Sequence, residues 1–267
     1  MLRSLNSLRR SFIARRLSVL ALLAIAWQIA ALIKANPLLF PSFTETVSAL
    51  LQSAGSEDLL SSAASSLLEL FKGYTLALSI ALVLVSLAVT LPFMRDVLQT
   101  LTAIFNPLPA IALLPLAMLW FGLGEASLLF VLVHAVVWPF SLAALAGFEQ
   151  VPEAQRLVGR NYGLRGPRYI LYILLPAALP SILSGLRVAW AFAWRTLIAS
   201  ELVFGVSSGT GGLGWFIYRN RNDLLTDRVF AGLATVILIG LFVEFAIFHL
   251  IERRTVERWG MQRPAAR

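Results

Sequence analysis

Six long apolar stretches constrain the fold of this chain of 267 residues more than any other feature of its sequence. A helix that crosses about 30 Å of hydrocarbon, at about 1.5 Å per residue, needs about 20 mainly apolar residues. The stretches lie at residues 17–33, 74–93, 98–121, 127–148, 170–204 and 229–251. They predict an all-α protein, namely a polytopic membrane helical bundle of about six transmembrane helices.

The composition favours a protein that folds in the lipid bilayer. Hydrophobic residues make up 58% of the chain and charged residues 13%, so a soluble fold would lack polar side chains to cover its core. The formal net charge is +8, but the basic residues flank the apolar stretches, which argues against nucleic-acid binding. With no cysteine, and with His134 and His249 far apart in the chain, we expect no metal site and no cofactor.

The arginine distribution predicts the orientation in the membrane. If both termini are cytoplasmic, the basic residues on the cytoplasmic side are Arg95, Arg156, Arg160, Arg165, Arg168, Arg253, Arg254, Arg258, Arg263 and Arg267. Those on the opposite side are Lys34, Lys72, Arg219, Arg221 and Arg228. Because positive charge collects on the cytoplasmic side, we expect a multi-pass membrane protein with both termini inside.

The chain divides into three expected parts. Residues 1–60 would hold a cytoplasmic N-terminus, the first transmembrane helix and an outer loop, and residues 252–267 a basic cytoplasmic tail. The core would span residues 61–251 and contain a cytoplasmic loop at residues 149–169. Residues 61–70 predict a short amphipathic helix on the outer surface, leading into the second span.

The third apolar stretch contains three prolines, Pro107, Pro109 and Pro115. Each proline removes an amide donor and crowds the preceding turn, so the three do not fit one straight helix. A broken helix at membrane depth indicates that protein or water, and not lipid, lies beside the break. The alternative is a kink whose free backbone groups bond to neighbouring helices.

The longest cytoplasmic loop predicts a short helix outside the membrane. Pro152 suits a first helical turn, Glu153 places negative charge at its positive end, and Gly163 followed by Leu164 suits a left-handed cap. The expected helix has about eleven residues and is roughly 16 Å long. The spacing fits equally a helix that docks in a groove of a soluble partner and one that anchors the loop through arginines and lipid phosphates.

Several motifs in this region and beyond it occur together. Gly163 is followed by an apolar run at residues 170–175 and by Pro-Ala-Ala-Leu-Pro-Ser-Ile-Leu-Ser-Gly-Leu-Arg at residues 176–187. Residues 107–115 contain Pro-Leu-Pro, residues 120–125 read Trp-Phe-Gly-Leu-Gly-Glu, Glu201 precedes Gly-Gly-Leu-Gly-Trp at 211–215, and residues 258–260 read Arg-Trp-Gly. As a set, these motifs resemble type I permeases of binding-protein-dependent ATP-binding-cassette (ABC) importers, and in particular the nitrate, taurine and alkanesulfonate permeases. The resemblance covers about residues 61–260.

The sequence departs from the family pattern at two places. The family loop usually carries Glu-Ala-Ala ending four residues before its glycine, whereas Leu157, Val158 and Gly159 occupy those positions here. Glu153 and Ala154 lie one helical turn earlier, and Asn106 stands where relatives often carry arginine.

The resemblance implies a non-catalytic permease subunit of an ATP-driven importer in a bacterial inner membrane. Two copies, a homodimer, would form one pathway for a sulfonate- or nitrate-like organic or inorganic anion delivered by a periplasmic binding protein, as in aliphatic sulfonate, taurine or nitrate transport. A separate ABC ATPase dimer would bind the ATP, and its closure would tilt the spans in alternating access. The chain itself has no Gly-x-x-x-x-Gly-Lys motif. The residues expected to couple to the ATPase are Glu153, Ala154, Arg160, Gly163, Leu164 and Pro176.

Charged residues inside the spans are candidates for the translocation pathway, because charge in a bilayer is costly unless it faces a cavity or a partner. They are Arg187, Arg195, Glu201 and Glu244. Arg187, Trp190 and Trp194 have the spacing of one helix face, which fits both a small anion and simple packing between helices. Arg187 could also reach lipid phosphates. The pathway candidates are Arg187, Trp190, Trp194, Arg195 and Glu201.

A glycine run at residues 209–214 precedes Trp215 on the outer side. It fits a lip that contacts the binding protein, through Gly211, Gly212, Gly214 and Trp215, and it equally fits a plain turn.

A secondary, ion-coupled transporter or a channel would explain the spans and buried charges, but not the loop helix or the motifs. A membrane enzyme would need clustered His, Asp or Glu, which the sequence does not present.

Overall fold

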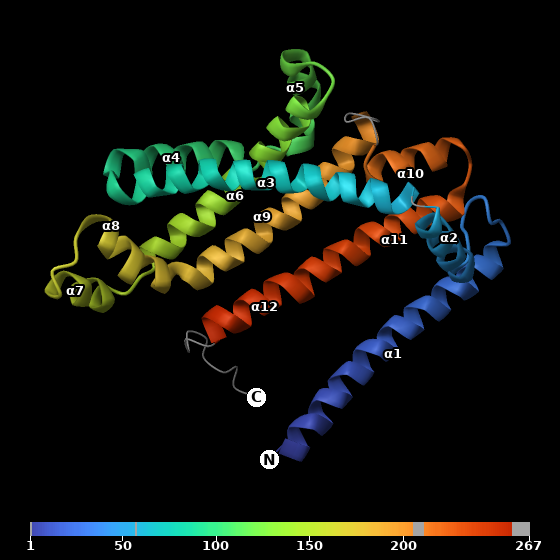
Figure 1. The fold of residues 1–267 in the computed structure, drawn as a ribbon, viewed down its shortest axis with the longest axis horizontal. Helices are drawn as coiled ribbons and strands as arrows, with labels where there is room; N and C mark the ends of the chain where they lie inside the picture. Colours follow the sequence, from blue (N-terminus) through green and yellow to red (C-terminus); the bar gives the residue numbers. More distant parts are fainter. Residues whose placement is uncertain (1, 57, 205–210, 258–267) are drawn as a thin grey trace. The chain divides into compact units, whose positions relative to one another are not determined.

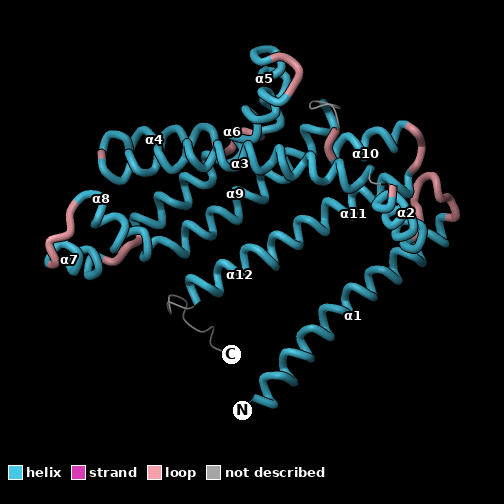
Figure 2. Tube along the Cα trace, in the orientation of Figure 1, coloured by secondary structure: helices cyan, strands magenta, loops and turns pink. Residues whose placement is uncertain are grey.

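The described part of the chain is built from helices. The computed structural model describes residues 2–56, 58–204 and 211–257, in which short loops join helices and no β-strand occurs (Figure 1 and Figure 2). The elements are α1 (Leu2–Lys34), α2 (Phe43–Gly55), α3 (Asp58–Thr90), α4 (Pro92–Phe105), η1 (Ala110–Leu113), α5 (Leu114–Phe121), α6 (Glu125–Glu149), α7 (Glu153–Asn161), α8 (Gly166–Tyr169), η2 (Ile170–Leu174), α9 (Leu175–Phe204), α10 (Leu213–Asn222), α11 (Thr226–Phe242), η3 (Val243–Phe248), α12 (His249–Glu252) and η4 (Arg253–Glu257). The 3₁₀ turn η1 precedes α5, and the π-helical turns η2, η3 and η4 lie within continuous helical segments.

Four of the six apolar stretches lie in single helices of membrane length. Four described segments are long and apolar enough to cross a bilayer, namely Asp58–Thr90, Glu125–Glu149, Ile170–Val203 and Thr226–Val256. The pair Pro92–Phe105 and Ala110–Phe121, which contains the third stretch, can form one further span, bent by 86° at its break. The remaining stretch is the shorter apolar helix Ser18–Lys34 within α1. The all-α, polytopic architecture is confirmed, and the third span is broken as its prolines predict.

The second span begins earlier than predicted. Residues 61–70 do not form a separate helix on the outer surface, because α3 runs without interruption from Asp58 to Thr90. Ser66 and Leu70 are fully buried. Packing against the rest of the protein therefore makes this segment the first turns of the span.

The chain divides into two compact units. The first unit comprises Met1–Ser61 and Phe216–Thr235. Within it, the Trp27 ring of α1 lies 5.6 Å from Phe43 of α2 and 5.7 Å from Phe230 of α11, centroid to centroid. The Trp27 indole nitrogen donates a hydrogen bond to the Pro41 carbonyl (3.0 Å). The sequence reading did not predict α2, which begins after a capping box made by Ser42 and Glu45.

The second unit comprises Ser62–Trp215 and Val236–Arg267, and α6 and α9 form its centre. The two helices run side by side in Figure 1. They approach closely because glycines face small residues: a Cβ on Gly147 would lie 2.6 Å from the Ser181 Cβ, and one on Gly185 would lie 2.7 Å from the Ala143 Cβ. The Tyr74 hydroxyl of α3 donates to the Leu186 carbonyl of α9 (2.8 Å). This core holds every site described below.

Candidate translocation and coupling sites

The loop helix exists as predicted and is capped at its C-terminal end. Helix α7 covers Glu153–Asn161 and follows Pro152, and Glu153 occupies its first turn. At its other end Gly163 has a φ of 71°, a left-handed conformation that favours glycine. The Gly163 amide donates to the Arg160 carbonyl (2.9 Å) and the Leu164 amide to the Gly159 carbonyl (3.0 Å), which is a Schellman cap.

Helix α7 is firmly seated on the second unit. The Arg156 guanidinium donates to the backbone carbonyls of Phe148 (2.6 Å) and Val151 (3.1 Å) at the end of α6. Gly159 is buried, and a Cβ there would lie 2.8 Å from Ile173 and 2.9 Å from Tyr169. A force applied to α7 would therefore reach both α6 and the start of the fifth span.

The other side of α7 is open and mixed in character. Leu157 and Val158 are about half exposed, at 48% and 49%, and Tyr162 just beyond the helix is 82% exposed. Arg160 lies 3.8 Å from Glu153, and both of these side chains are largely exposed. Beside this face, Pro176 and Val158 help to line a cavity of about 270 Å³. Exposed apolar side chains ringed by charge are typical of a docking surface.

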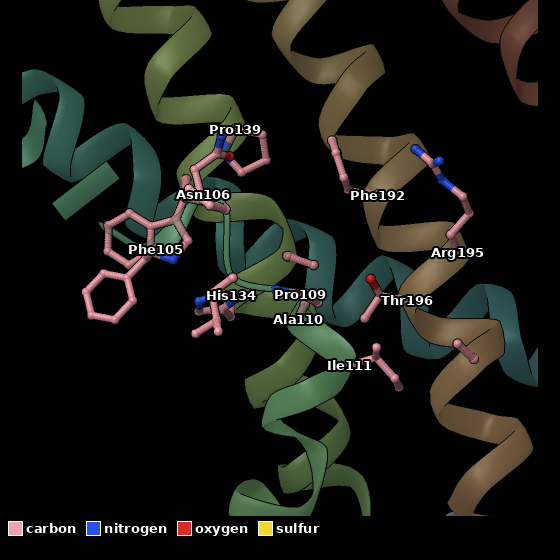
Figure 3. Close-up of a pocket in the computed structure, with 15 residues that line it drawn as sticks. Phe105, Asn106, Pro109, Ala110, Ile111, His134, Pro139, Phe192, Arg195 and Thr196 are labelled. Atoms are coloured by element: carbon pink, nitrogen blue, oxygen red, sulfur yellow. The ribbon is translucent and has the colours of Figure 1, made fainter. Parts of the chain in front are cut away.

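A second cavity, of about 450 Å³, lies at the break in the third span. The wall contains the non-helical residues between α4 and η1, together with α6 and α9 residues, as Figure 3 shows. The lining residues are Phe105, Asn106, Pro107, Leu108, Pro109, Ala110, Ile111, His134, Ala135, Trp138, Pro139, Phe192, Arg195, Thr196 and Ala199. Irregular backbone is tolerated at membrane depth where it borders a cavity. The break in the third span, which contains Pro107 and Pro109, borders this cavity. We name this space the break cavity.

Aromatic rings and unpaired polar atoms line one side of the break cavity. Phe105 stacks on Trp138 at 5.0 Å between centroids, and His134 meets Phe105 edge to face at 6.0 Å. Both ring nitrogens of His134 and the indole nitrogen of Trp138 are buried without a hydrogen-bond partner among the described residues. The sequence did not predict a site at these residues, because nothing in their spacing indicates a cavity.

Arg195 stands on the α9 side of the break cavity. Phe192, Arg195, Thr196 and Ala199 follow the spacing of one helix face. In Figure 3 Thr196 points toward the break, whereas the Arg195 side chain lies farther out, with its guanidinium carbon 5.1 Å from the Phe192 ring centroid. Arg195 Nε donates to the Ala191 carbonyl (2.9 Å), and no carboxylate among the described residues forms an ion pair with Arg195.

The tryptophan face of α9 lies opposite the cavity face and packs against other helices. Trp190 and Trp194 stack on each other with a centroid distance of 6.3 Å, and Tyr74 meets Trp190 edge to face. The Trp194 indole nitrogen donates to the Val236 carbonyl of α11 (3.2 Å). Both tryptophans thus occupy helix–helix contacts within the second unit.

Arg187 joins α9 to the last helical segment. Its Nη2 lies 3.0 Å from Glu252 and its Nε lies 3.2 Å from Glu244. The same guanidinium lies over the Phe248 ring at 5.7 Å. Because two carboxylates already surround this cation, it is less suited to hold an anion than Arg195.

Glu201 holds three segments together at the end of α9. Its carboxylate accepts hydrogen bonds from the Ser66 hydroxyl (2.7 and 2.9 Å to the two oxygens) and from the Gly214 amide (2.8 Å). The Leu213 amide in turn donates to the Ser66 oxygen (2.8 Å). Glu201 is 3% exposed. The carboxylate therefore binds the start of α10 to α3 and α9, and we call this set of contacts the Glu201 clamp.

The glycines expected to form an outer lip lie inside this clamp. Gly211, Gly212 and Gly214 are buried, and a Cβ on Gly214 would lie 2.6 Å from both the Glu201 Cβ and the Ile198 carbonyl. Trp215 is partly buried. Gly209 and residue 210 fall outside the described residues, as do Arg258, Trp259 and Gly260. Contact of this segment with a binding protein stays a prediction.

A helical membrane bundle with a capped loop helix and a broken span beside a cavity has the architecture of a transport protein. The sequence matches the family model for binding-protein-dependent transport system inner membrane components over residues 73–256. The match covers more than half of the chain, which therefore belongs to this family. Permease subunits of ABC importers are its relatives, so the resemblance drawn from the motifs is confirmed.

Three relatives illustrate the range of the family. The chain is 31% identical to the taurine transport system permease protein TauC of Escherichia coli over 240 residues, which cover 88% of this chain and 86% of the relative. It is 31% identical to the nitrate import permease protein NrtB of Synechocystis sp. over 180 residues, 67% of this chain and 64% of the relative. The putative aliphatic sulfonates transport permease protein SsuC of Escherichia coli is 31% identical over 162 residues, 61% of this chain and 59% of the relative.

Proposed function

We propose that the chain is the non-catalytic membrane subunit of an ATP-driven importer that passes a small anion to the cytoplasm by alternating access. A periplasmic binding protein would deliver the anion, two copies of the chain would form the pathway, and a separate ATPase dimer would bind ATP. The observation that carries this proposal is α7, a capped helix between two spans with exposed Leu157, Val158 and Tyr162. Family membership supplies the class of partner.

The seat of α7 explains how docking could move the spans. Arg156 ties the helix to the end of α6, and Gly159 packs on Ile173 of η2. Helices α6 and α9 pack tightly through small residues, so they would move together as one body. Closure of an ATPase pair would then displace α6 and α9 without unfolding α7.

Polar replacement of the exposed apolar residues tests coupling. Leu157→Asp and Tyr162→Asp alter only the open side of α7, so membrane insertion should persist while co-purification of the ATPase and uptake are both lost. Arg165→Asp, an exposed change in the same loop but outside α7, is the matched control and should retain both. Co-purification and uptake at the wild-type level in the two α7 variants would show that α7 is not the coupling element.

The anionic cargo is inferred from Arg195. Arg195 lies in a predicted span, is one of the residues that line the break cavity, and forms no ion pair with the described carboxylates. A cation in that position is costly unless it meets water or an anion, and a guanidinium suits sulfonate, nitrate and carboxylate oxygens. Relatives named for taurine, nitrate and aliphatic sulfonates agree with this cargo.

Neutralising Arg195 tests the cargo. Arg195→Gln should lower ATP-driven uptake of taurine, nitrate or an alkanesulfonate into proteoliposomes by about tenfold or more, since a hydrogen bond to a charged group contributes about 1.5–3 kcal/mol. Arg195→Lys keeps the charge and should retain part of the uptake. Wild-type uptake by Arg195→Gln would exclude Arg195 from the pathway. Uptake by the wild-type chain without ATP would instead indicate an ion-coupled transporter.

A further inference from the structure

A third cavity, of about 280 Å³, lies where α3 and α6 end and where the fifth span begins. It is distinct from the break cavity and shares no residue with it. Its lining residues are Val89, Thr90, Arg95, Leu145, Phe148, Glu149, Arg156, Arg160, Gly166, Tyr169, Ile170 and Leu174. We name it the arginine pocket.

The polar side of the arginine pocket has an excess of positive charge. Three arginines, Arg95, Arg156 and Arg160, line it together with the single carboxylate of Glu149. The Arg95 Nε lies 3.8 Å from Glu149, a separation too long for a hydrogen bond. Arg160 likewise lies 3.8 Å from Glu153. Arg95 and Arg160 therefore keep most of their donor groups free for another anion.

The opposite side of the arginine pocket is apolar and belongs to the spans. Val89 ends α3, Leu145 and Phe148 end α6, and Leu174 lies at the start of the fifth span. Leu145 and Leu174 are buried, whereas Val89 and Phe148 keep part of their surface exposed. Ends of spans lie at the level of the lipid headgroups, so an acyl chain would pass this wall while a headgroup meets the arginines.

We propose that the arginine pocket binds the phosphate headgroup of an anionic phospholipid. Guanidinium groups pair with phosphate oxygens through two parallel hydrogen bonds. An excess of two positive charges over negative ones among the lining side chains favours an anionic headgroup over a zwitterionic one. The apolar wall favours a lipid over free phosphate. Because Arg156 also holds α7, the bound lipid lies against the base of that helix.

Removal of Arg95 tests this proposal apart from any role of α7 in coupling, because Arg95 belongs to α4. The full-length chain, in the complex with which it purifies, is placed in nanodiscs of phosphatidylcholine with a minor fraction of phosphatidylglycerol. Native mass spectrometry then counts the phosphatidylglycerol molecules retained per chain. Arg95→Gln and Arg160→Gln should each weaken retention about tenfold, and Arg165→Gln, which removes the same charge outside the pocket, should leave it unchanged. Arg95 and Arg160 are 45% and 62% exposed, so neither change removes a buried contact.

Three outcomes would overturn the proposal, and one of them would identify free phosphate as the bound anion. Equal retention of phosphatidylglycerol by Arg95→Gln and by the Arg165→Gln control would overturn the proposal. So would equal retention of phosphatidylcholine and phosphatidylglycerol by the wild-type chain. Displacement of phosphatidylglycerol by millimolar inorganic phosphate would show a site for free phosphate and overturn the lipid assignment. If the wild-type chain retains phosphatidylglycerol in the presence of phosphate and the Arg95→Gln variant does not, the result supports the lipid site.

Discussion

At the scale of single residues, Glu201 shows what a carboxylate needs inside an apolar bundle. A buried carboxylate is costly unless hydrogen bonds satisfy its oxygens. Here the Ser66 hydroxyl and the Gly214 amide supply them, and no basic side chain among the described residues pairs with it. The amides of Leu213 and Gly214 belong to the first turn of α10, where the helix dipole also favours negative charge.

The Glu201 clamp predicts a coupled loss of stability. Ser66→Ala and Glu201→Gln should each lower the free energy of unfolding in detergent by about 1–3 kcal/mol, because each leaves buried polar groups unsatisfied. The double variant should lose less than the sum of the two, since both changes remove the same hydrogen bond. Denaturant titrations followed by size-exclusion chromatography measure these losses. Ser79→Ala, an exposed change in the same helix, is the control, and strict additivity would contradict the clamp.

At the scale of elements, α2 depends on its capping box. The Ser42 hydroxyl accepts from the Glu45 amide (3.2 Å), and the Ser42 amide donates to the Glu45 carboxylate (2.7 Å). The Ser42 hydroxyl also donates to the Glu45 carboxylate (2.9 Å). The hydrogen bonds that the carboxylate accepts from the Ser42 amide and hydroxyl hold the pKa of Glu45 below its ordinary value of 4.5. Because the folded-state pKa is the lower one, the stabilisation is complete above the ordinary value and is lost as the pH falls through the folded-state pKa.

Removal of the cap should loosen α2 measurably. Ser42→Ala should lower the free energy of local opening of α2 by about 1 kcal/mol. Amide hydrogen exchange in residues 43–55 should therefore become roughly fivefold faster. Ser48→Ala, an exposed change within the same helix, should have little effect. In the wild-type chain, exchange corrected for its intrinsic pH dependence should accelerate below pH 4.5, and Glu45→Gln should abolish that acceleration. Equal protection of α2 in Ser42→Ala and Ser48→Ala would contradict a role for the cap.

The sequence could predict the elements whose signals are local. Apolar runs located the spans, Pro107 and Pro109 located the break, and Pro152 with Gly163 bounded α7 to within two residues. Helix α2 was missed although Ser42 and Glu45 carry a capping signal, because the flanking segment is mixed in character. Contacts between distant segments had no local signal: 135 residues separate Ser66 from Glu201, and 65 separate Arg187 from Glu252.

At the scale of the whole molecule, the distribution of arginine and the fold of the second unit both place Arg95 and the loop at residues 149–169 on one side of the membrane. The sequence places Arg95 and the loop at residues 149–169 on the same side of the membrane. The arginine pocket brings Arg95 together with Arg156 and Arg160 of that loop. A multi-pass chain could not do so if these segments lay on opposite faces of a bilayer.

The side itself is open to a direct test, because the chain contains no cysteine. We expect α7 in the cytoplasm and the connection between α10 and α11 outside, since positive charge is retained on the cytoplasmic face. Asn161→Cys and Asn222→Cys place single thiols at exposed ends of α7 and α10. A membrane-impermeant maleimide should label Asn222→Cys in intact spheroplasts, and Asn161→Cys only after permeabilisation, with the cysteine-free chain as the unlabelled control. Labelling of Asn161→Cys in intact spheroplasts would put α7 outside, beyond the reach of any cytoplasmic ATPase, and would overturn both the orientation and the proposed coupling.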